Sequence, residues 1–200
     1  MDLNDYRKEL IDAALQRISG IETPERVNEC LLYEFVDRLT QAEEFSDIIP
    51  CHFSGTGSRG RRMRVDGYQL DEADDSIRLV ICDFSAEEES PDSLTRTRAE
   101  ASFRQVEAFI DDSSCGRIWS ESGIGEFDAA ELASMIESRG SNVSRYRIYL
   151  FTDSLMSGRI KELPEGKVGD VPAEYHIWDV SRLAAVSQSM LGLEEGGCRH

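Results

Sequence analysis

The sequence lacks the patterns that mark membrane-spanning and secreted, disulfide-rich proteins. Its first residues, MDLNDYRKELIDAAL, contain no apolar core like that of a signal peptide. No run approaches the roughly 20 apolar residues that a helix needs to span a bilayer. The five cysteines are odd in number and form no CxxC pair, which indicates reduced thiols rather than a disulfide framework or a zinc site. We therefore expect a cytoplasmic protein without membrane contact.

Metal-binding histidine clusters and nucleotide-binding motifs are also missing. The three histidines, His52, His176 and His200, are scattered, and none has a partner at the usual zinc-ligand spacing. Neither a P-loop nor a nucleophile elbow occurs. Residues 55–60 fit the string GxGxxG, but a strand rather than a helix is expected to follow them. The dinucleotide-binding context therefore fails, and a hairpin loop is the better interpretation.

Basic side chains are scarce. The chain has 22 Lys and Arg against 39 Asp and Glu, a formal charge of −17, which works against non-specific attraction to nucleic acid or anionic membranes. Within this acidic chain Arg59, Arg61, Arg62 and Arg64 form a local cluster. One hypothesis is that they bind phosphate, nucleic acid or an acidic partner surface. The alternative is a solvated loop that offsets nearby carboxylates.

The pattern of apolar residues predicts one domain of 195 residues, with a helical start over 1–46, a sheet-containing core over 47–191 and a tail over 196–200. Helices are expected over Tyr6–Ile18, from Thr23-Pro24 to about Phe45, over Leu94–Ser113 and Glu126–Arg139, and from Val180 to about Leu191. Strands are expected over Ile48–Phe53, Met63–Leu70, Ser76–Phe84, Arg145–Thr152 and Glu174–Trp178. This order indicates the α/β (α+β) class, a mixed β-sheet flanked by helices.

Two expected strands each carry one aspartate in apolar surroundings, Asp66 and Asp83. A buried carboxylate is costly unless it is paired, hydrogen-bonded or bound to a cation. If Tyr68 pairs with Leu79, Asp66 faces Ile81, and Asp83 lies on the same face at a diagonal distance of roughly 7–8 Å. Two carboxylates so placed are candidate ligands for a shared Mg²⁺. The alternative is structural: an Asp-Gly bend at Asp66 and backbone hydrogen bonds at Asp83.

The order α-β-β-β-α-β, with acidic residues on the second and third strands, resembles the restriction-endonuclease-like PD-(D/E)xK core. The resemblance implies that Asp66 and Asp83 hold a metal and that Glu34, on the preceding helix, is a further catalytic acid. In that family a lysine two positions after the second acid assists the attacking water. Here Ser85 stands at the lysine position, and no lysine lies near it in the sequence.

A second resemblance covers most of the chain, from about Tyr33 to Met190. The strings VDGYQLDEADDSIRLVICDFS, SLTRTRAEASFRQVEAFI, YRIYLFTDSLMSGRI and YHIWDVSRL are similar to the N-terminal region of the abortive infection phage resistance (AIPR) proteins. Members of this family are bacterial defence proteins and are much longer than 200 residues. The resemblance implies that this domain works together with a C-terminal region of a full-length protein.

These observations favour a degenerate nuclease-like module that binds or senses a partner, with nucleic acid at the Arg59–Arg64 loop as one candidate. Two alternatives stay open. One is an active Mg²⁺-dependent nuclease that uses Asp66, Asp83 and Glu34. The other is a structural or oligomerisation module. Whether the domain is an enzyme is not decided by the sequence.

Overall fold

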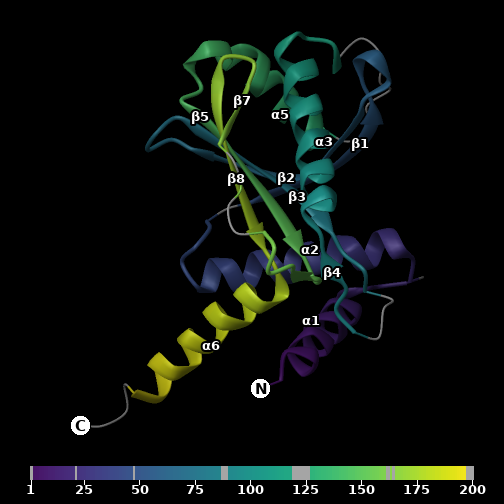
Figure 1. The fold of residues 1–200 in the computed structure, drawn as a ribbon, viewed down its shortest axis with the longest axis vertical. Helices are drawn as coiled ribbons and strands as arrows, with labels where there is room; N and C mark the ends of the chain where they lie inside the picture. The colour runs from purple at the N-terminus through teal and green to yellow at the C-terminus, as the bar shows by residue number, and fades with distance from the viewer. Residues whose placement is uncertain are drawn as a thin grey trace.

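The computed structural model describes residues 2–20, 22–46, 48–86, 90–118, 127–160, 163 and 165–196. The helices are α1 (Leu3–Arg17), α2 (Pro24–Gln41), α3 (Arg96–Ser114), α5 (Phe127–Arg139) and α6 (Val180–Gly196). The strands are β1 (Ile49–Thr56), β2 (Arg62–Asp71), β3 (Ser76–Asp83), β4 (Ser93–Leu94), β5 (Arg145–Thr152), β6 (Leu155–Met156), β7 (Gly166–Val168) and β8 (Val171–Trp178). Figure 1 shows their arrangement.

The centre of the molecule is a six-stranded mixed sheet in the order β1-β2-β3-β5-β8-β7. The strands β1, β2 and β3 form an antiparallel meander, and β3, β5 and β8 run parallel. The short β7 closes the far edge antiparallel to β8. The carboxyl ends of three parallel strands therefore meet at one end of the sheet, where α1, α2 and the start of α6 lie (Figure 1).

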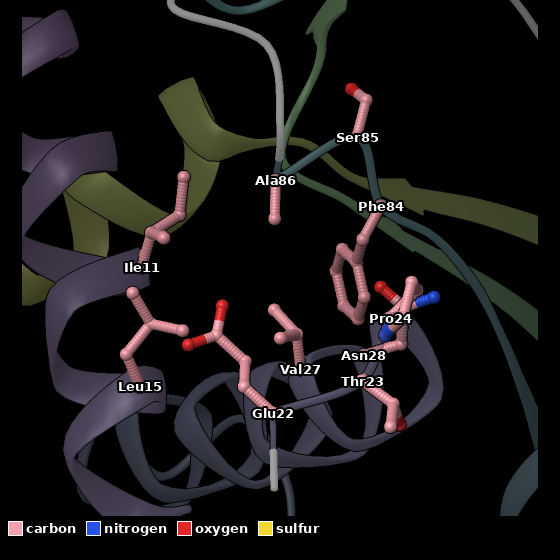
Figure 2. Close-up of a pocket in the computed structure, with 10 residues that line it drawn as sticks. All are labelled: Ile11, Leu15, Glu22, Thr23, Pro24, Val27, Asn28, Phe84, Ser85 and Ala86. Carbon is pink, nitrogen blue, oxygen red and sulfur yellow. The ribbon is translucent and has the colours of Figure 1, made fainter.

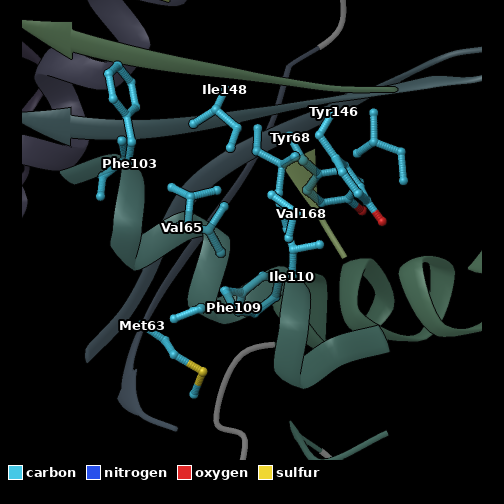
Figure 3. Close-up of a cluster of buried hydrophobic side chains, with 14 of the residues drawn as sticks. Met63, Val65, Tyr68, Phe103, Phe109, Ile110, Tyr146, Ile148 and Val168 are labelled. Carbon is cyan, nitrogen blue, oxygen red and sulfur yellow. The ribbon is translucent and has the colours of Figure 1, made fainter. Parts of the chain in front are cut away.

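Each face of the sheet carries its own hydrophobic core, because side chains alternate along each strand. Leu79, Ile81 and Ile148 point to one face and pack against α3 and α5; Figure 3 shows part of this core, with Phe103, Phe109 and Ile110 of α3. Val80 and Phe151 point to the other face and pack against α1, α2 and α6. The sheet is thus the middle layer of three.

Local capping signals explain where several helices begin. The side chain of Thr23 accepts a hydrogen bond from the Arg26 N–H, and Pro24 follows at the first helical position. The side chain of Thr95 caps α3 in the same way. At α6 the carboxylate of Asp179 accepts the N–H of Arg182 at 2.8 Å. None of the helices in the described ranges is long and apolar enough to cross a membrane.

The ten elements expected from the sequence are all present, and the mixed α/β class is confirmed. The three shortest strands, β4, β6 and β7, were not expected, since two or three residues carry no periodicity. Helix α2 ends at Gln41 rather than near Phe45, and α6 continues to Gly196. Glu126 and residues 197–200 lie outside the described residues. The specific likeness to the endonuclease core and the domain bounds stay predictions.

Candidate functional site

Asp66 sits where the β2–β3 ladder ends. The expected pairing of Tyr68 with Leu79 is confirmed, and the ladder runs only as far as Gly67 opposite Val80. Beyond that point the Asp66 carboxylate takes the place of a backbone acceptor, since it accepts the backbone N–H of Cys82 at 2.7 Å. Asp66 is only 5% exposed, and its second bond comes from Nε of Arg64 at 3.1 Å. This carboxylate therefore stabilises the fork between two strands.

A cavity of about 490 Å³ opens beside Asp66. Its lining comes from α2, from β1, and from the fork itself: Glu25, Asn28, Glu29, His52, Phe53, Ser54, Arg64, Asp66 and Cys82. His52 enters it at a β-bulge of β1, where its φ of 40° is left-handed. Its Nε2 lies 3.9 Å from Oε1 of Glu29. The cavity thus combines carboxylates, an imidazole, an amide and a guanidinium.

The electrostatics of the cavity are governed by burial. Burial raises the pKa of Asp66, against the opposing effects of the Arg64 charge and the Cys82 N–H. Burial likewise raises the pKa of the Cys82 thiol well above its usual range, and the nearby Asp66 carboxylate adds to this. The thiol therefore stays protonated at neutral pH and is a poor nucleophile.

Asp83 points to the opposite face of the sheet. It ends β3 on the side of Ile81, and its carboxylate pairs with Arg98 of α3, with Oδ2 2.5 Å from Nε and Oδ1 2.8 Å from Nη2. Asp66 instead opens toward α2. The expectation that the two aspartates share a face is therefore wrong. The cause is a register shift between β1 and β2 beside Asp66, between the pairs Pro50–Gly67 and Phe53–Val65. Val65 and Tyr68 therefore belong to the same core, and the alternation of β2 that the argument assumed is broken between them.

Glu34 is also remote from the cavity. Its side chain is buried on α2 between Arg17, whose Nε lies 2.5 Å from Oε1, and Arg38, whose Nη1 lies 3.5 Å from Oε2. The helix instead presents Glu25 and Glu29 to the cavity. Their i,i+4 spacing places them on one face of α2, and that signal was available in the sequence. The sequence contains no comparable signal for the β-bulge that places His52 in the cavity.

A Mg²⁺ ion shared by Asp66 and Asp83 does not fit these side chains. The sheet separates the two carboxylates, and an arginine already neutralises each of them. Within the described ranges, no group of three or more His, Cys, Asp or Glu residues is placed to hold a metal ion. Ser85 is engaged through its backbone: its N–H donates to Asp153 at 2.8 Å and its carbonyl accepts from Arg7 at 2.7 Å.

The four arginines of the Arg59–Arg64 cluster do not form one surface. Arg64 turns inward to Asp66, and Arg61 pairs with Asp111 at 2.8 Å. Arg59 and Arg62 are exposed. Asp112 of α3 holds the loop by accepting the Ser58 N–H at 2.6 Å and its hydroxyl at 2.7 Å. Arg59 and Arg61 instead line, together with Arg117, a hollow of about 330 Å³.

A larger cavity of about 570 Å³ lies at the carboxyl end of β3. Figure 2 shows Ile11 and Leu15 of α1 and Val27 of α2 facing Phe84 across it, with the Glu22 carboxylate between them. The carboxyl ends of parallel strands are the usual ligand position in α/β sheets. Here the lining mixes apolar side chains with Glu22, Thr23, Asn28 and Ser85, and it contains no basic side chain among the described residues.

One protein-family model matches this chain, the abortive infection phage resistance protein N-terminal domain, over residues 31–185. The chain belongs to this family. The match contains all the strands of the central sheet as well as Glu34, Asp66 and Asp83, whereas Glu25 and Glu29 of the cavity precede it. Searches of curated proteins and of solved structures found no match. The resemblance to the abortive infection phage resistance family that the sequence indicated is thereby confirmed.

Proposed function

We propose that this domain of an abortive infection phage resistance protein is a binding module that recognises nucleic acid without cutting it. It acts in the cytoplasm, as a sensor for a C-terminal region of the full-length protein. The family's description as an N-terminal domain and its role in phage resistance support this reading. Phage infection exposes a cell to foreign nucleic acid, so a nucleic-acid sensor fits that role.

The observation that carries the proposal is the separation of Asp66 and Asp83. Metal-dependent hydrolysis of a phosphodiester needs carboxylates that converge on the ion. These two point to opposite faces, and arginines compensate both. Ser85 supplies no cation at the position where the nuclease pattern has lysine. Asp66 then serves to cap the strand fork, and Asp83 to tie β3 to α3.

An active nuclease is the second candidate, and one observation favours it. The cavity beside Asp66 also contains Glu25, Glu29 and His52. A buried carboxyl with a raised pKa in such a cleft is a common property of catalytic groups. This version of the nuclease hypothesis replaces Asp83 and Glu34 with residues from the first turns of α2.

One experiment separates these functions. The domain is incubated with plasmid DNA, single-stranded DNA and RNA in the presence of Mg²⁺ or Mn²⁺, beside Asp66→Asn and Asp83→Asn. We expect no cleavage, together with retarded migration of nucleic acid at low salt. Cleavage that Asp66→Asn abolishes would establish the nuclease. Absence of both cleavage and retardation would leave a structural or oligomerisation module.

A further inference from the structure

The sheet face that packs on α2 changes from apolar to polar along the strands. The register of β2, β3, β5 and β8 places its residues in rows across the sheet. The two rows near the carboxyl ends are largely apolar: Cys82, Phe151 and Trp178, then Val80, Tyr149 and His176. The next two rows are polar: Gln69, Arg78, Arg147 and Glu174, then Asp71, Ser76 and Arg145.

Helices cover only the apolar rows. Val80, Cys82, Tyr149, Phe151 and Trp178 belong to the core shared with α1, α2 and α6. The charged side chains of the polar rows belong to neither hydrophobic core. We call the set Asp71, Arg78, Arg145, Arg147, Glu174 and His176 the polar sheet face. Its side chains keep between 18% and 43% of their surface exposed.

The polar sheet face has a local excess of positive charge in a strongly acidic chain. Its carboxylates are already shared: Glu174 lies 2.5 Å from Arg145 and 3.4 Å from Arg147, and Asp71 lies 2.7 Å from Arg78. Arg147 also pairs with Asp74 of the β2–β3 turn. Two further cations lie on neighbouring elements, Lys167 on β7 and Arg182 on α6. Within the face itself, three arginines, Arg78, Arg145 and Arg147, stand against two carboxylates, Asp71 and Glu174; the neighbours add one carboxylate, Asp74, and two cations, Lys167 and Arg182.

Several polar atoms of this face are buried but unpaired. They are Nε of Arg78 and Nε of Arg145, together with Oε1 of Gln69, which lies beside the face in the row of Arg78, and none of the three has a hydrogen-bond partner among the described residues. Nε2 of His176 lies 3.7 Å from Oε2 of Glu174. Gln69 is itself only 9% exposed. Buried polar groups in native proteins normally find a partner in protein, water or a ligand. The three unpaired atoms in these polar rows indicate that further polar groups complete the surface.

An aromatic pair lies among these cations. The His176 ring stacks on Tyr149, with centroids 4.7 Å apart and planes 19° from parallel, and its side chain stays 36% exposed. The Arg182 guanidinium covers the neighbouring Trp178 ring at 3.7 Å. Aromatic rings interleaved with arginines are the usual means by which sheet surfaces bind single-stranded nucleic acid, since bases stack on the rings and arginines contact phosphates.

We propose that the polar sheet face is the nucleic-acid-binding surface of this domain and that it binds a single strand. A base stacks on His176, and Arg145 and Arg147 contact the flanking phosphates. This inference rests on the proposed function and moves the binding surface away from the Arg59–Arg64 loop. It also fits the strongly negative net charge, because a single strand contacts one narrow face and avoids the acidic remainder.

The test measures fluorescence anisotropy of labelled 20-nucleotide RNA and DNA single strands with the whole domain at low salt. Arg145→Gln and His176→Ala are the face variants, and Arg62→Gln is the control at an exposed arginine in the other region. Each face variant should weaken binding by about tenfold, since stacking or one phosphate contact is lost. His176→Phe keeps a ring and should retain binding within about twofold. Arg62→Gln should bind like the wild type.

Arg145→Gln should also reduce the slope of log K against log salt by about 0.7, the value for one single-strand phosphate. Circular dichroism melting checks that each variant folds. Binding that is lost in Arg62→Gln but kept in both face variants would overturn this surface and leave the proposed function intact. If no strand binds the wild type, the proposed function fails. A polyglutamate peptide that binds the face while nucleic acid does not would point to an acidic protein partner and overturn the inference.

Discussion

Arg7 of α1 and Asp153, just after β5, form an ion pair in which both side chains are buried. Nη2 of Arg7 lies 2.6 Å from Oδ2 of Asp153, and the side chains are 4% and 0% exposed. The same guanidinium donates to the carbonyl of Ser85 at 2.7 Å, while Asp153 accepts the Ser85 N–H at 2.8 Å. One pair thus joins α1 to the carboxyl ends of β3 and β5.

Removal of one partner from this pair should destabilise the domain strongly. Arg7→Leu leaves the Asp153 carboxylate buried without its cation, which costs about 3–5 kcal/mol. Urea unfolding followed by circular dichroism measures the loss. Lys8→Leu, one position along the same helix on an exposed residue, is the matched control and should change the free energy of unfolding by less than about 0.5 kcal/mol. An equal effect of the two substitutions would show that Arg7 does not anchor α1.

Asp66 and Asp112 should contribute in opposite directions to the pH dependence of the free energy of unfolding. Burial raises the pKa of Asp66 above the ordinary value of about 3.9, so the folded protein holds that proton more tightly than the unfolded chain does. As the pH rises from about 3.9 through the folded pKa, ionisation of Asp66 lowers the free energy of unfolding. The stability of the wild type minus that of Asp66→Asn should therefore fall over this interval, by at most about 1.4 kcal/mol per pH unit.

At Asp112 burial opposes ionisation, but the Ser58 hydroxyl and N–H and the Arg117 charge outweigh it and lower the pKa. Its stabilising contribution is present above about pH 3.9 and is lost as the pH falls through the folded pKa. The difference between the wild type and Asp112→Asn should thus grow with pH, opposite to that for Asp66→Asn. Unfolding in urea at several pH values measures both. Parallel curves for the two variants would contradict the assigned environments.

The sequence predicts the fold of this chain better than its site. Periodicity and capping residues locate the long elements, and the Tyr68–Leu79 register follows from the hairpin. The inference about Asp66 and Asp83 fails because it extends strand alternation through Asp66 and Gly67, where the register between β1 and β2 shifts. A side chain that replaces a ladder bond, as Asp66 does with Cys82, leaves no mark in the apolar pattern.

The residues of the cavity and of the polar sheet face also differ in how far their positions can be predicted from the sequence. The positions of Arg145 and Arg147 on one strand face follow from the period of two. Their neighbours Arg78 and Glu174 come from strands that are distant in sequence, so the row exists only once the order β3-β5-β8 is known. His52 is placed by a bulge at which its backbone is left-handed. Because the residue there is not glycine, the sequence does not indicate this backbone conformation.

The capping role of Asp179 leads to a stability prediction. Its carboxylate accepts the N–H of Arg182 at 2.8 Å, which caps α6, and also the N–H of Met156 at 2.8 Å, which ties β6 to the helix start. Asp179→Ala loses both and should cost about 1–2 kcal/mol, whereas Asp179→Asn keeps a cap oxygen and should cost less. Thermal melting of the three proteins measures this. A melting temperature of Asp179→Asn as low as that of Asp179→Ala would exclude capping as the cause.

Gly57 should not tolerate a side chain, because Asp112 occupies the space. A Cβ at this position would lie 2.3 Å from Oδ2 of Asp112 and 2.6 Å from the sulfur of Met63. Asp112 is fixed by its bonds to Ser58, so it cannot move without losing them. Gly57→Ala should therefore destabilise the domain by about 1–3 kcal/mol through overpacking.

The matched control is Gly158→Ala, where a Cβ would meet no atom within 4 Å. That substitution should change the free energy of unfolding by less than about 0.5 kcal/mol. Gly57→Ala in an Asp112→Ala background tests the cause, since the smaller side chain removes the closest clash. The cost of the glycine substitution should then shrink. If it stays the same, the contact with Met63 rather than the Asp112 carboxylate fixes the glycine, and the loop is held by packing instead of by the acid.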